Sequence, residues 1–203
     1  MTVENTNKLI GISGTNGSGK DTIGNILANN YGFWFCSLSD ILREELKNMG
    51  LSFSRENMRE LSTNWRREFG VSILVDKAQA EFTQQEANYI GLAMASIRNP
   101  GEADAIHQAG GLMLWVDADP KIRYQRVKNR SEKGGLNSRV DDLLTFDQFI
   151  NEEAAEMNHP KITDGMTLSM SKVKSKCDIF MQNNGQDLTE LTKLIGQRLN
   201  LEH

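Results

Sequence analysis

Apolar residues gather in five short runs along the chain, and stretches with the spacing of amphipathic helices separate these runs. The runs lie at residues 8–13, 33–36, 89–97, 112–116 and 177–181. Strands that alternate with helices at this spacing predict parallel pairing, right-handed crossovers and helices on both faces of one sheet. The pattern therefore predicts an α/β fold class with a five-stranded parallel sheet.

The helical stretches carry start and stop signals. Ser39 or Asp40 is expected to cap a helix over residues 41–49, because short polar side chains accept hydrogen bonds from first-turn amides. The pattern stays helical from 51 to 85, with a break at Gly70. Further helical patterns occupy 146–157 and 188–195.

The chain length suits one domain, which we expect to span residues 1–203. Its core is predicted at 8–39, 89–130 and 146–203, with a helical insert at about 40–88. The polar, glycine-containing segment at about 131–145 joins two helical patterns. We predict that this segment forms a lid.

A glycine-rich loop follows the first apolar run and precedes a helical pattern. It fits G-x-x-x-x-G-K, with Asp21 where Ser or Thr usually stands and Thr22 one place later. Its glycines permit positive φ angles, so successive N–H groups point into one concavity that binds anions. The helix N-terminus and the Lys20 ammonium also favour negative charge. The loop predicts binding of nucleotide phosphates by Gly14, Thr15, Asn16, Gly17, Ser18, Gly19, Lys20, Asp21 and Thr22.

Other polar residues also follow predicted strands. In folds of this type, ligands bind at the carboxyl ends of the strands. The glycine loop, residues 37–43, Arg98 and Asp117 all stand at such ends. We therefore expect them to meet on one edge of the sheet.

Composition narrows the class of protein. The chain has 203 residues and a net charge of −4, and no apolar run approaches the length of a membrane span. The acidic balance argues against a dedicated nucleic-acid surface. Cys36 and Cys177 lie far apart, and the histidines lack metal-ligand spacing. We predict a cytoplasmic protein with no nucleic-acid or membrane partner, and magnesium is the only metal implied.

These segments resemble P-loop kinases of the nucleoside monophosphate kinase type, the group that contains adenylate kinase. The glycine loop is similar to that family's loop, which places a residue without a hydroxyl after the lysine and then a threonine. Residues 37–43 resemble its acceptor-binding segment, and Arg98 with the following 99–102 stands where an arginine contacts the acceptor phosphate. Residues 115–130 resemble the strand and arginine-bearing helix that lead to the lid.

The resemblance covers nearly the whole chain and is greatest to uncharacterised adenylate-kinase-like proteins of archaea. Viral deoxynucleoside monophosphate kinases share the Gly-Lys-Asp-Thr ending of the loop. The resemblance implies a three-layer P-loop kinase fold, ATP and Mg²⁺ as cofactors, and a small-molecule phosphate acceptor. The implied reaction transfers the γ-phosphoryl group of ATP to a nucleoside or deoxynucleoside monophosphate.

Arginines suit this chemistry because the transferring phosphoryl group spreads negative charge over its oxygens. On this interpretation Lys20, Arg126 and Arg130 are catalytic, and Arg139 closes with them over the transferring group. The residues assigned to the acceptor are Ser37, Asp40, Arg43 and Arg98.

Simpler interpretations apply to several of these residues. A lone arginine is usually a solvated surface charge, so Arg43, Arg98 and Arg139 could each be an ordinary surface residue. The arginines at 123, 126 and 130 fit the solvated face of an amphipathic helix. Asp119, next to a proline, is most simply the cap of that helix.

One departure from the family pattern concerns magnesium. The family commonly ends its third strand with an acidic residue and a glycine, and that carboxylate positions the metal through water. Here Ala95 and Ser96 stand at these positions. Asp21 and Asp117 are the candidate residues to replace this carboxylate near the magnesium ion. Asp21 could equally be an acidic residue in the first turn of a helix, where the helix dipole favours negative charge.

Two other functions remain open. Dephospho-coenzyme A is an alternative acceptor, and its hydroxyl would favour a nearby carboxylate base such as Asp40. The alternative from another class is a nucleotide-binding protein with little or no kinase activity, which Ala95 favours.

Overall fold

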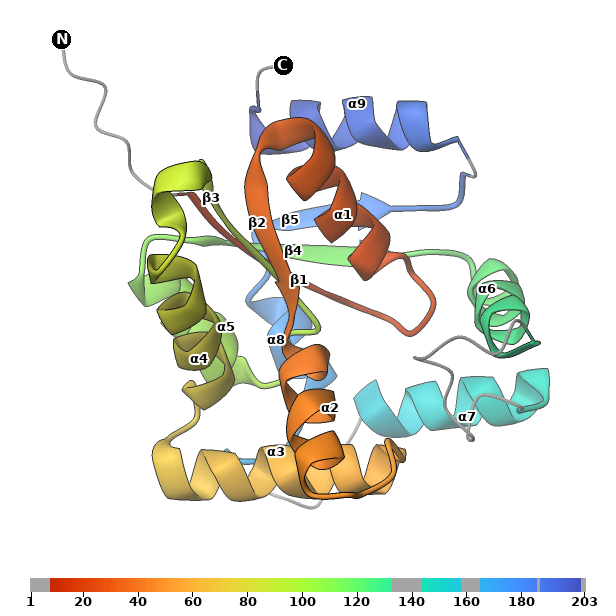
Figure 1. Ribbon diagram of the computed structural model, residues 1–203. Coiled ribbons are helices and arrows are strands. Elements are labelled where there is room, and N and C mark those ends of the chain that lie inside the picture. The colour runs from red at the N-terminus through yellow and green to blue at the C-terminus, as the bar shows by residue number, and fades with distance from the viewer. Residues whose placement is uncertain (1–7, 133–143, 158–164, 186, 202–203) are drawn as a thin grey trace, which may run out of the picture.

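The computed structural model describes residues 8–132, 144–157, 165–185 and 187–201 (Figure 1). Its centre is a five-stranded parallel sheet with the strand order β2-β3-β1-β4-β5. The strands are β1 (Lys8–Gly14), β2 (Phe33–Ser37), β3 (Gly91–Ala95), β4 (Leu112–Asp117) and β5 (Ile179–Gln182). The predicted α/β fold class is therefore confirmed.

Helices cover both faces of the sheet (Figure 1). On one face α1 (Lys20–Tyr31) and α9 (Leu188–Leu199) bury apolar side chains such as Leu27 and Ile195 against Ile12 of β1. The other face is covered by α2 (Leu38–Asn48), α3 (Arg55–Phe69), α4 (Ile73–Thr83), α5 (Pro100–Gln108) and α8 (Met170–Ser175). Because neighbouring residues of a strand point to opposite faces, Ala93 and Met94 enter different cores.

The remaining helices of the described residues are α6 (Pro120–Glu132) and α7 (Phe146–Met157), and a 3₁₀ turn, η1 (Glu86–Asn88), precedes β3. Figure 1 shows α6 and α7 beyond the loop that follows β1. The predicted lid at 131–145 lies mostly outside the described residues, and so does Arg139. No helix in the described ranges has the length and apolar character that crossing a membrane requires.

The helices of the predicted insert share a core with the sheet. Leu42 of α2, Met58 of α3 and Val75 of α4 are buried in the same cluster as Met94 of β3. Gly70, at φ 102°, separates α3 from α4 at the predicted break. This shared packing fixes α2 and α3 relative to the carboxyl ends of the strands.

The start of α2 differs from the prediction. The helix begins at Leu38, directly after β2, so neither Ser39 nor Asp40 caps it. Ser37 is the N-cap residue but makes no capping bond with its side chain. Its hydroxyl instead lies 3.1 Å from the Ser96 hydroxyl.

The ends of two strands also differ from the prediction. β3 stops at Ala95 because Ser96 has a φ of 68°, which turns the chain out of the strand. β5 begins two residues later than expected, since the Cys177 amide still donates to the Lys174 carbonyl at 3.2 Å at the end of α8. The polar sequence of α8 itself carried no clear helical signal.

Candidate active site

The loop between β1 and α1 has the backbone geometry of an anion-binding nest. Gly14, Gly17 and Gly19 have φ angles of 142°, 79° and 94°, which residues with a Cβ rarely adopt. Gly19 is also the N-cap residue of α1, and no side chain caps this helix. The first-turn amides of α1 are therefore available to an anion, and the helix dipole adds to the attraction.

Close packing of the loop also requires its glycines. A Cβ on Gly17 would lie 2.6 Å from the carbonyl oxygen of Arg123, and one on Gly14 would overlap the carbonyl oxygen of Val116. These neighbours are backbone atoms of the β4–α6 region, which cannot move independently of the sheet. The loop is held against β4 and the start of α6.

Lys20 bends back over the loop. Its Nζ atom donates to the carbonyl oxygens of Gly14 at 3.1 Å and Thr15 at 2.7 Å. These two bonds hold the ammonium at the mouth of the nest. The residue occupies the position of the lysine that contacts the outer phosphates in P-loop proteins.

Asn183 is a site residue that the sequence interpretation missed. Its buried side chain donates from Nδ2 to the Ser18 carbonyl at 2.8 Å, and its amide donates to the Asp117 carbonyl at 2.8 Å. It follows β5 directly, so the rule that ligand sites lie at the ends of strands could have identified it. Asn183 ties the phosphate loop to the ends of β4 and β5.

The three arginines of α6 have different environments. Arg123 is only 4% exposed, so the interpretation of this residue as part of a solvated helix face is wrong. Its Nε donates to the Ala118 carbonyl at 2.7 Å, and its Nη1 pairs with Glu153 of α7 at 2.8 Å. Arg123 therefore braces the loop region against α7.

Arg126 and Arg130 line the cleft above the loop. Arg126 donates to the carbonyl oxygens of Asn183 at 3.0 Å and Gly185 at 2.9 Å. Partial burial lowers the pKa of its guanidinium, which nevertheless remains charged because arginine titrates far above neutral pH.

Asp119 accepts a hydrogen bond from the Lys121 amide at 2.8 Å, as expected of a helix cap.

Most of the predicted site residues line one open cleft of about 1540 Å³. Those that line it are Asn16, Gly17, Gly19, Lys20, Asp21, Thr22, Ser37, Asp40, Arg43, Arg98, Arg126 and Arg130. Gly14 and Thr15 border a smaller neighbouring cavity, Ser18 is buried, and Asp117 lines neither. Segments far apart in the sequence thus meet where the strands end.

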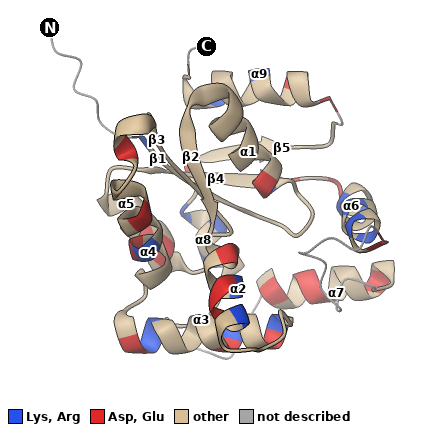
Figure 2. Ribbon diagram, viewed as in Figure 1, with Lys and Arg blue, Asp and Glu red and all other residues tan. Residues whose placement is uncertain are grey.

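Carboxylates hold the arginines opposite the loop. Arg43 pairs with Asp40 one turn earlier on α2. Arg98 pairs through Nη1 with Glu156 of α7 at 3.2 Å, and Glu156 also lies 3.4 Å from Arg55. Figure 2 shows several acidic residues along α7. An anionic ligand at Arg98 would compete with the Glu156 carboxylate for the guanidinium.

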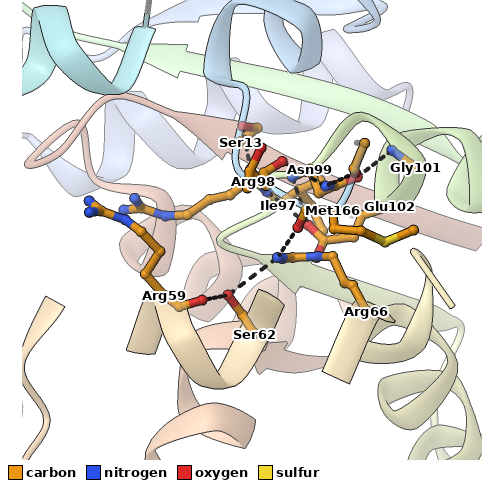
Figure 3. Close-up of polar contacts among 12 residues, drawn as sticks. Ser13, Arg59, Ser62, Arg66, Ile97, Arg98, Asn99, Gly101, Glu102 and Met166 are labelled. Carbon is orange, nitrogen blue, oxygen red and sulfur yellow. Dashed lines mark hydrogen bonds and ion pairs between the residues drawn. The ribbon is translucent and has the colours of Figure 1, made fainter. Parts of the chain in front are cut away.

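A buried ion pair fixes the backbone at Arg98 (Figure 3). Arg66 and Glu102 are 1% and 0% exposed, and Arg66 Nη2 donates to Glu102 Oε1 at 2.7 Å. Glu102 Oε2 accepts from the amides of Arg98 and Asn99, each at 3.0 Å. Asn99 and Glu102 form a capping box at the start of α5. Their spacing in the sequence signals that box, but nothing there marks Arg66 as the partner of Glu102.

Comparisons with known proteins agree with this geometry. A family model described as an AAA domain matches residues 10–157. The chain belongs to this AAA domain family. A UPF0200 protein of Methanococcus maripaludis is 26% identical over 179 residues, covering 88% of each chain. The cytidylate kinase of Archaeoglobus fulgidus is 29% identical over 124 residues, which are 61% of this chain and 62% of that enzyme.

Solved structures show the same fold. Shikimate kinase from Bacteroides thetaiotaomicron superposes with a TM-score of 0.61 at 15% identity, covering 96% of this chain and 99% of that chain. At this identity the likeness concerns the fold alone. Together the matches confirm the predicted resemblance to P-loop kinases and the three-layer P-loop kinase fold.

The two candidate magnesium residues of this AAA domain protein differ in their surroundings. Asp117 Oδ1 accepts from the Thr15 hydroxyl at 2.7 Å and the Ala118 amide at 2.8 Å, and it lies 3.4 Å from Arg123 Nε. These contacts suit a residue that shapes the loop. Asp21, in the first turn of α1, lines the cleft beside Thr22. Of the two carboxylates, Asp21 is the one that faces the ligand space.

The loop fits a polyphosphate with Mg²⁺. Glycine φ angles, an uncapped helix N-terminus and a lysine converge on one concavity. Within the described ranges, no three His, Cys, Asp or Glu residues gather as a metal cluster. Magnesium does not require one, because it usually takes one or two protein ligands, waters and phosphate oxygens. Asp21 and Thr22 offer a carboxylate and a hydroxyl for this purpose.

Proposed function

We propose that this protein is an ATP-dependent kinase that transfers a phosphoryl group to a nucleoside or deoxynucleoside monophosphate. The observation that carries the proposal is the shared cleft. The phosphate loop forms one wall, and Ser37, Arg43 and Arg98 form the opposite wall. A donor and an acceptor that both carry phosphate could therefore face each other in this space.

The loop would bind the donor. Its backbone N–H groups and the α1 N-terminus would hold the phosphates, and Lys20 would leave the Gly14 and Thr15 carbonyls to contact the outer ones. Asp21 and Thr22 would hold Mg²⁺ beside them. When bound, the metal neutralises charge on the phosphate oxygens.

The arginines would bind the acceptor and stabilise the transferring group. Arg43 and Arg98 would form charge-assisted hydrogen bonds with the acceptor phosphate. Arg126 and Arg130, on the α6 side of the cleft, would stabilise negative charge that develops on the transferring phosphoryl group. Positioning and electrostatics supply most of the catalysis in this kind of reaction.

The relatives support this class of reaction. One relative carries the name cytidylate kinase, and structures of shikimate kinase share the fold. Dephospho-coenzyme A is a weaker candidate acceptor, because Asp40, the candidate base, is already engaged in an ion pair with Arg43. A nucleotide-binding protein with little activity is the second candidate, and the absence of a carboxylate at Ala95 favours it.

A screen of acceptors tests the proposal. The ribo- and deoxyribonucleoside monophosphates and dephospho-coenzyme A would each be incubated with ATP and Mg²⁺, with Lys20→Ala as the control. We expect at least one monophosphate to be converted to the diphosphate, and Lys20→Ala to abolish most of that conversion. Tight ATP binding without turnover of any acceptor would support the nucleotide-binding protein instead. Equal turnover by Lys20→Ala would contradict the assignment of the site.

A further inference from the structure

Three arginines of the described chain pair with glutamates of α7, and each arginine comes from a different element. The pairs are Arg123 with Glu153 at 2.8 Å, Arg98 with Glu156 at 3.2 Å, and Arg55 with Glu152 at 2.9 Å and Glu156 at 3.4 Å. The sequence of α7 contains no lysine or arginine. Arg123 braces the loop and Arg98 belongs to the wall opposite the loop, whereas Arg55 belongs to neither.

Arg55 is the first residue of α3, which starts beside α7 (Figure 1). A positive charge in the first turn is unfavourable for the helix dipole, so α3 itself gains nothing from this arginine. The side chain is 17% exposed and reaches toward α7. The surroundings of that side chain therefore indicate its role.

Arg55 lies between the phosphate loop and Arg98. Together with Glu156 it borders two cavities, and these are the only two described residues that line both. The lining of one cavity includes Ser96 and Arg98, which also line the main cleft. The lining of the other includes residues 14–16 of the loop. Arg55 thus borders both the space at the loop and the space at Arg98.

The loop residues near Arg55 mark the place where the outer phosphates of a nucleotide arrive. Gly14 and Thr15 line the cavity on the loop side, and their carbonyl oxygens accept hydrogen bonds from the Lys20 ammonium. A lysine at this position of a P-loop contacts the β- and γ-phosphates. On the proposed function, the acceptor phosphate binds at Arg98. Arg55 therefore stands between the positions of the donor and the acceptor.

The ion pairs between Arg55 and α7 leave its guanidinium open to exchange. The guanidinium turns to α7, and Arg55 does not line the main cleft. Glu152 is 39% exposed, and a pair so open to water contributes little to stability. The phosphates of a donor carry more negative charge than a carboxylate and present several acceptor oxygens to the same planar fork. Bound phosphates can therefore draw the Arg55 side chain away from α7.

We propose that Arg55 is a catalytic residue whose guanidinium contacts the phosphoryl group during its transfer. The inference rests on the proposed function, because it adds a residue to that reaction. An oxygen of the acceptor phosphate forms a bond to the γ-phosphorus of ATP, the bond from that phosphorus to the bridging oxygen breaks, and ADP leaves with the electron pair. The guanidinium donates hydrogen bonds to the equatorial oxygens, over which the negative charge is spread.

The test removes the two sides of the Arg55–Glu152 pair separately. Arg55→Ala and Glu152→Gln both break the pair, so they would have the same effect if the pair only fastened α7. With ATP, Mg²⁺ and each nucleoside monophosphate, we expect Arg55→Ala to lower the single-turnover rate of phosphoryl transfer at least about thirtyfold. Glu152→Gln should keep the wild-type rate or raise it. Arg55→Lys keeps the charge but lacks the planar fork and should give an intermediate rate.

Binding of a planar phosphoryl mimic supplies a second measurement. Titration calorimetry would compare ADP alone with ADP and aluminium fluoride, each with Mg²⁺. Arg55→Ala should weaken binding of the aluminium fluoride complex about tenfold or more and leave the affinity for ADP unchanged, because the contact exists only during transfer. Arg67→Ala is the matched control, because Arg67 is an exposed arginine of α3 that lines neither cavity. Unchanged ADP affinity and melting temperature would show that the variants fold.

Equal losses of rate in Arg55→Ala and Glu152→Gln, or a wild-type rate in Arg55→Ala, would overturn the inference and leave the kinase proposal standing. If the wild-type protein phosphorylates no monophosphate, the kinase proposal fails. Binding of the aluminium fluoride complex that depends on Arg55 would then still support the inference. Binding that is independent of Arg55, or no binding, would overturn it as well.

Discussion

The two walls of the main cleft attract phosphate by different means. The loop wall uses backbone: three glycines with positive φ angles, an uncapped helix N-terminus and a lysine that rests on loop carbonyls. The opposite wall uses side chains, and each of its arginines is already paired with a carboxylate, Arg43 with Asp40 and Arg98 with Glu156. The loop wall is thus formed before a ligand arrives, whereas on the arginine wall an external anion competes with internal carboxylates.

The largest expected effect is on stability and concerns the buried Arg66–Glu102 pair that supports the arginine wall. Arg66→Met should lower the free energy of unfolding by about 3–5 kcal/mol, because it leaves the Glu102 carboxylate buried without its charged partner. Urea denaturation measures this loss. The double variant Arg66→Met with Glu102→Leu removes both charges and should lose less than the single variant. Equal losses would mean that the pair contributes packing alone.

The next effect concerns the loop wall. Lys20→Ala should lower kcat by at least about a hundredfold, or roughly 3 kcal/mol, as expected when one preorganised charge leaves the transition state. Steady-state formation of ADP measures this loss. The melting temperature should change little, because the hydrogen bonds from the lysine to the Gly14 and Thr15 carbonyls hold a loop and not the buried core. A loss of a few fold would show that the backbone nest is sufficient without the ammonium.

A smaller effect concerns the one strained backbone position of the arginine wall. Ser96 has a φ of 68°, a region that costs a residue with a Cβ about 1–2 kcal/mol. Ser96→Gly and Ser96→Ala both remove the hydroxyl that contacts Ser37. The difference between their free energies of unfolding therefore reports the cost of the positive φ angle. Ser96→Gly should be more stable than Ser96→Ala by about 1 kcal/mol in thermal or urea unfolding. Equal stabilities would exclude strain at this residue.

The smallest effect is on acceptor binding and concerns the Glu156 carboxylate that pairs with Arg98. Glu156→Gln should lower the KM for the acceptor about two- to fivefold, because a neutral amide competes less well for Arg98 than a carboxylate does. Glu153→Gln is the matched control on the same helix, since Glu153 pairs with Arg123 rather than with the acceptor wall. An unchanged or raised KM in Glu156→Gln would indicate that Glu156 supports the arginine instead of competing for it.

The contrast between the walls also explains what the sequence could predict. Glycine spacing and a lysine at a fixed offset encode the loop locally, so the start of α1 near Gly19 and the positive φ angles of the loop glycines agree with the prediction. Alternation of strands and helices was enough for the sheet, which placed Arg43 and Arg98 on the same edge.

What the sequence could not provide depends on pairs distant along the chain. Arg66 finds Glu102, and Arg98 finds Glu156, only after α3 and α7 have packed beside the strand ends. Arg123 looked like a surface residue because its partners come from α7 and the chain just after β4. The missed cap of α2 has the same cause, since the Ser37 hydroxyl faces Ser96 across two strand ends.

The most direct test of the kinase proposal is to measure both products in one reaction. The protein would be incubated with ATP, Mg²⁺ and a mixture of nucleoside monophosphates other than AMP, and ADP and nucleoside diphosphate would be separated and quantified over time. AMP would be tested in a reaction of its own, where two ADP form from each ATP that is consumed. The account predicts that one new nucleoside diphosphate forms for each additional ADP, and that both depend on Lys20. ADP released without a matching nucleoside diphosphate, or no ADP despite bound ATP, would contradict it.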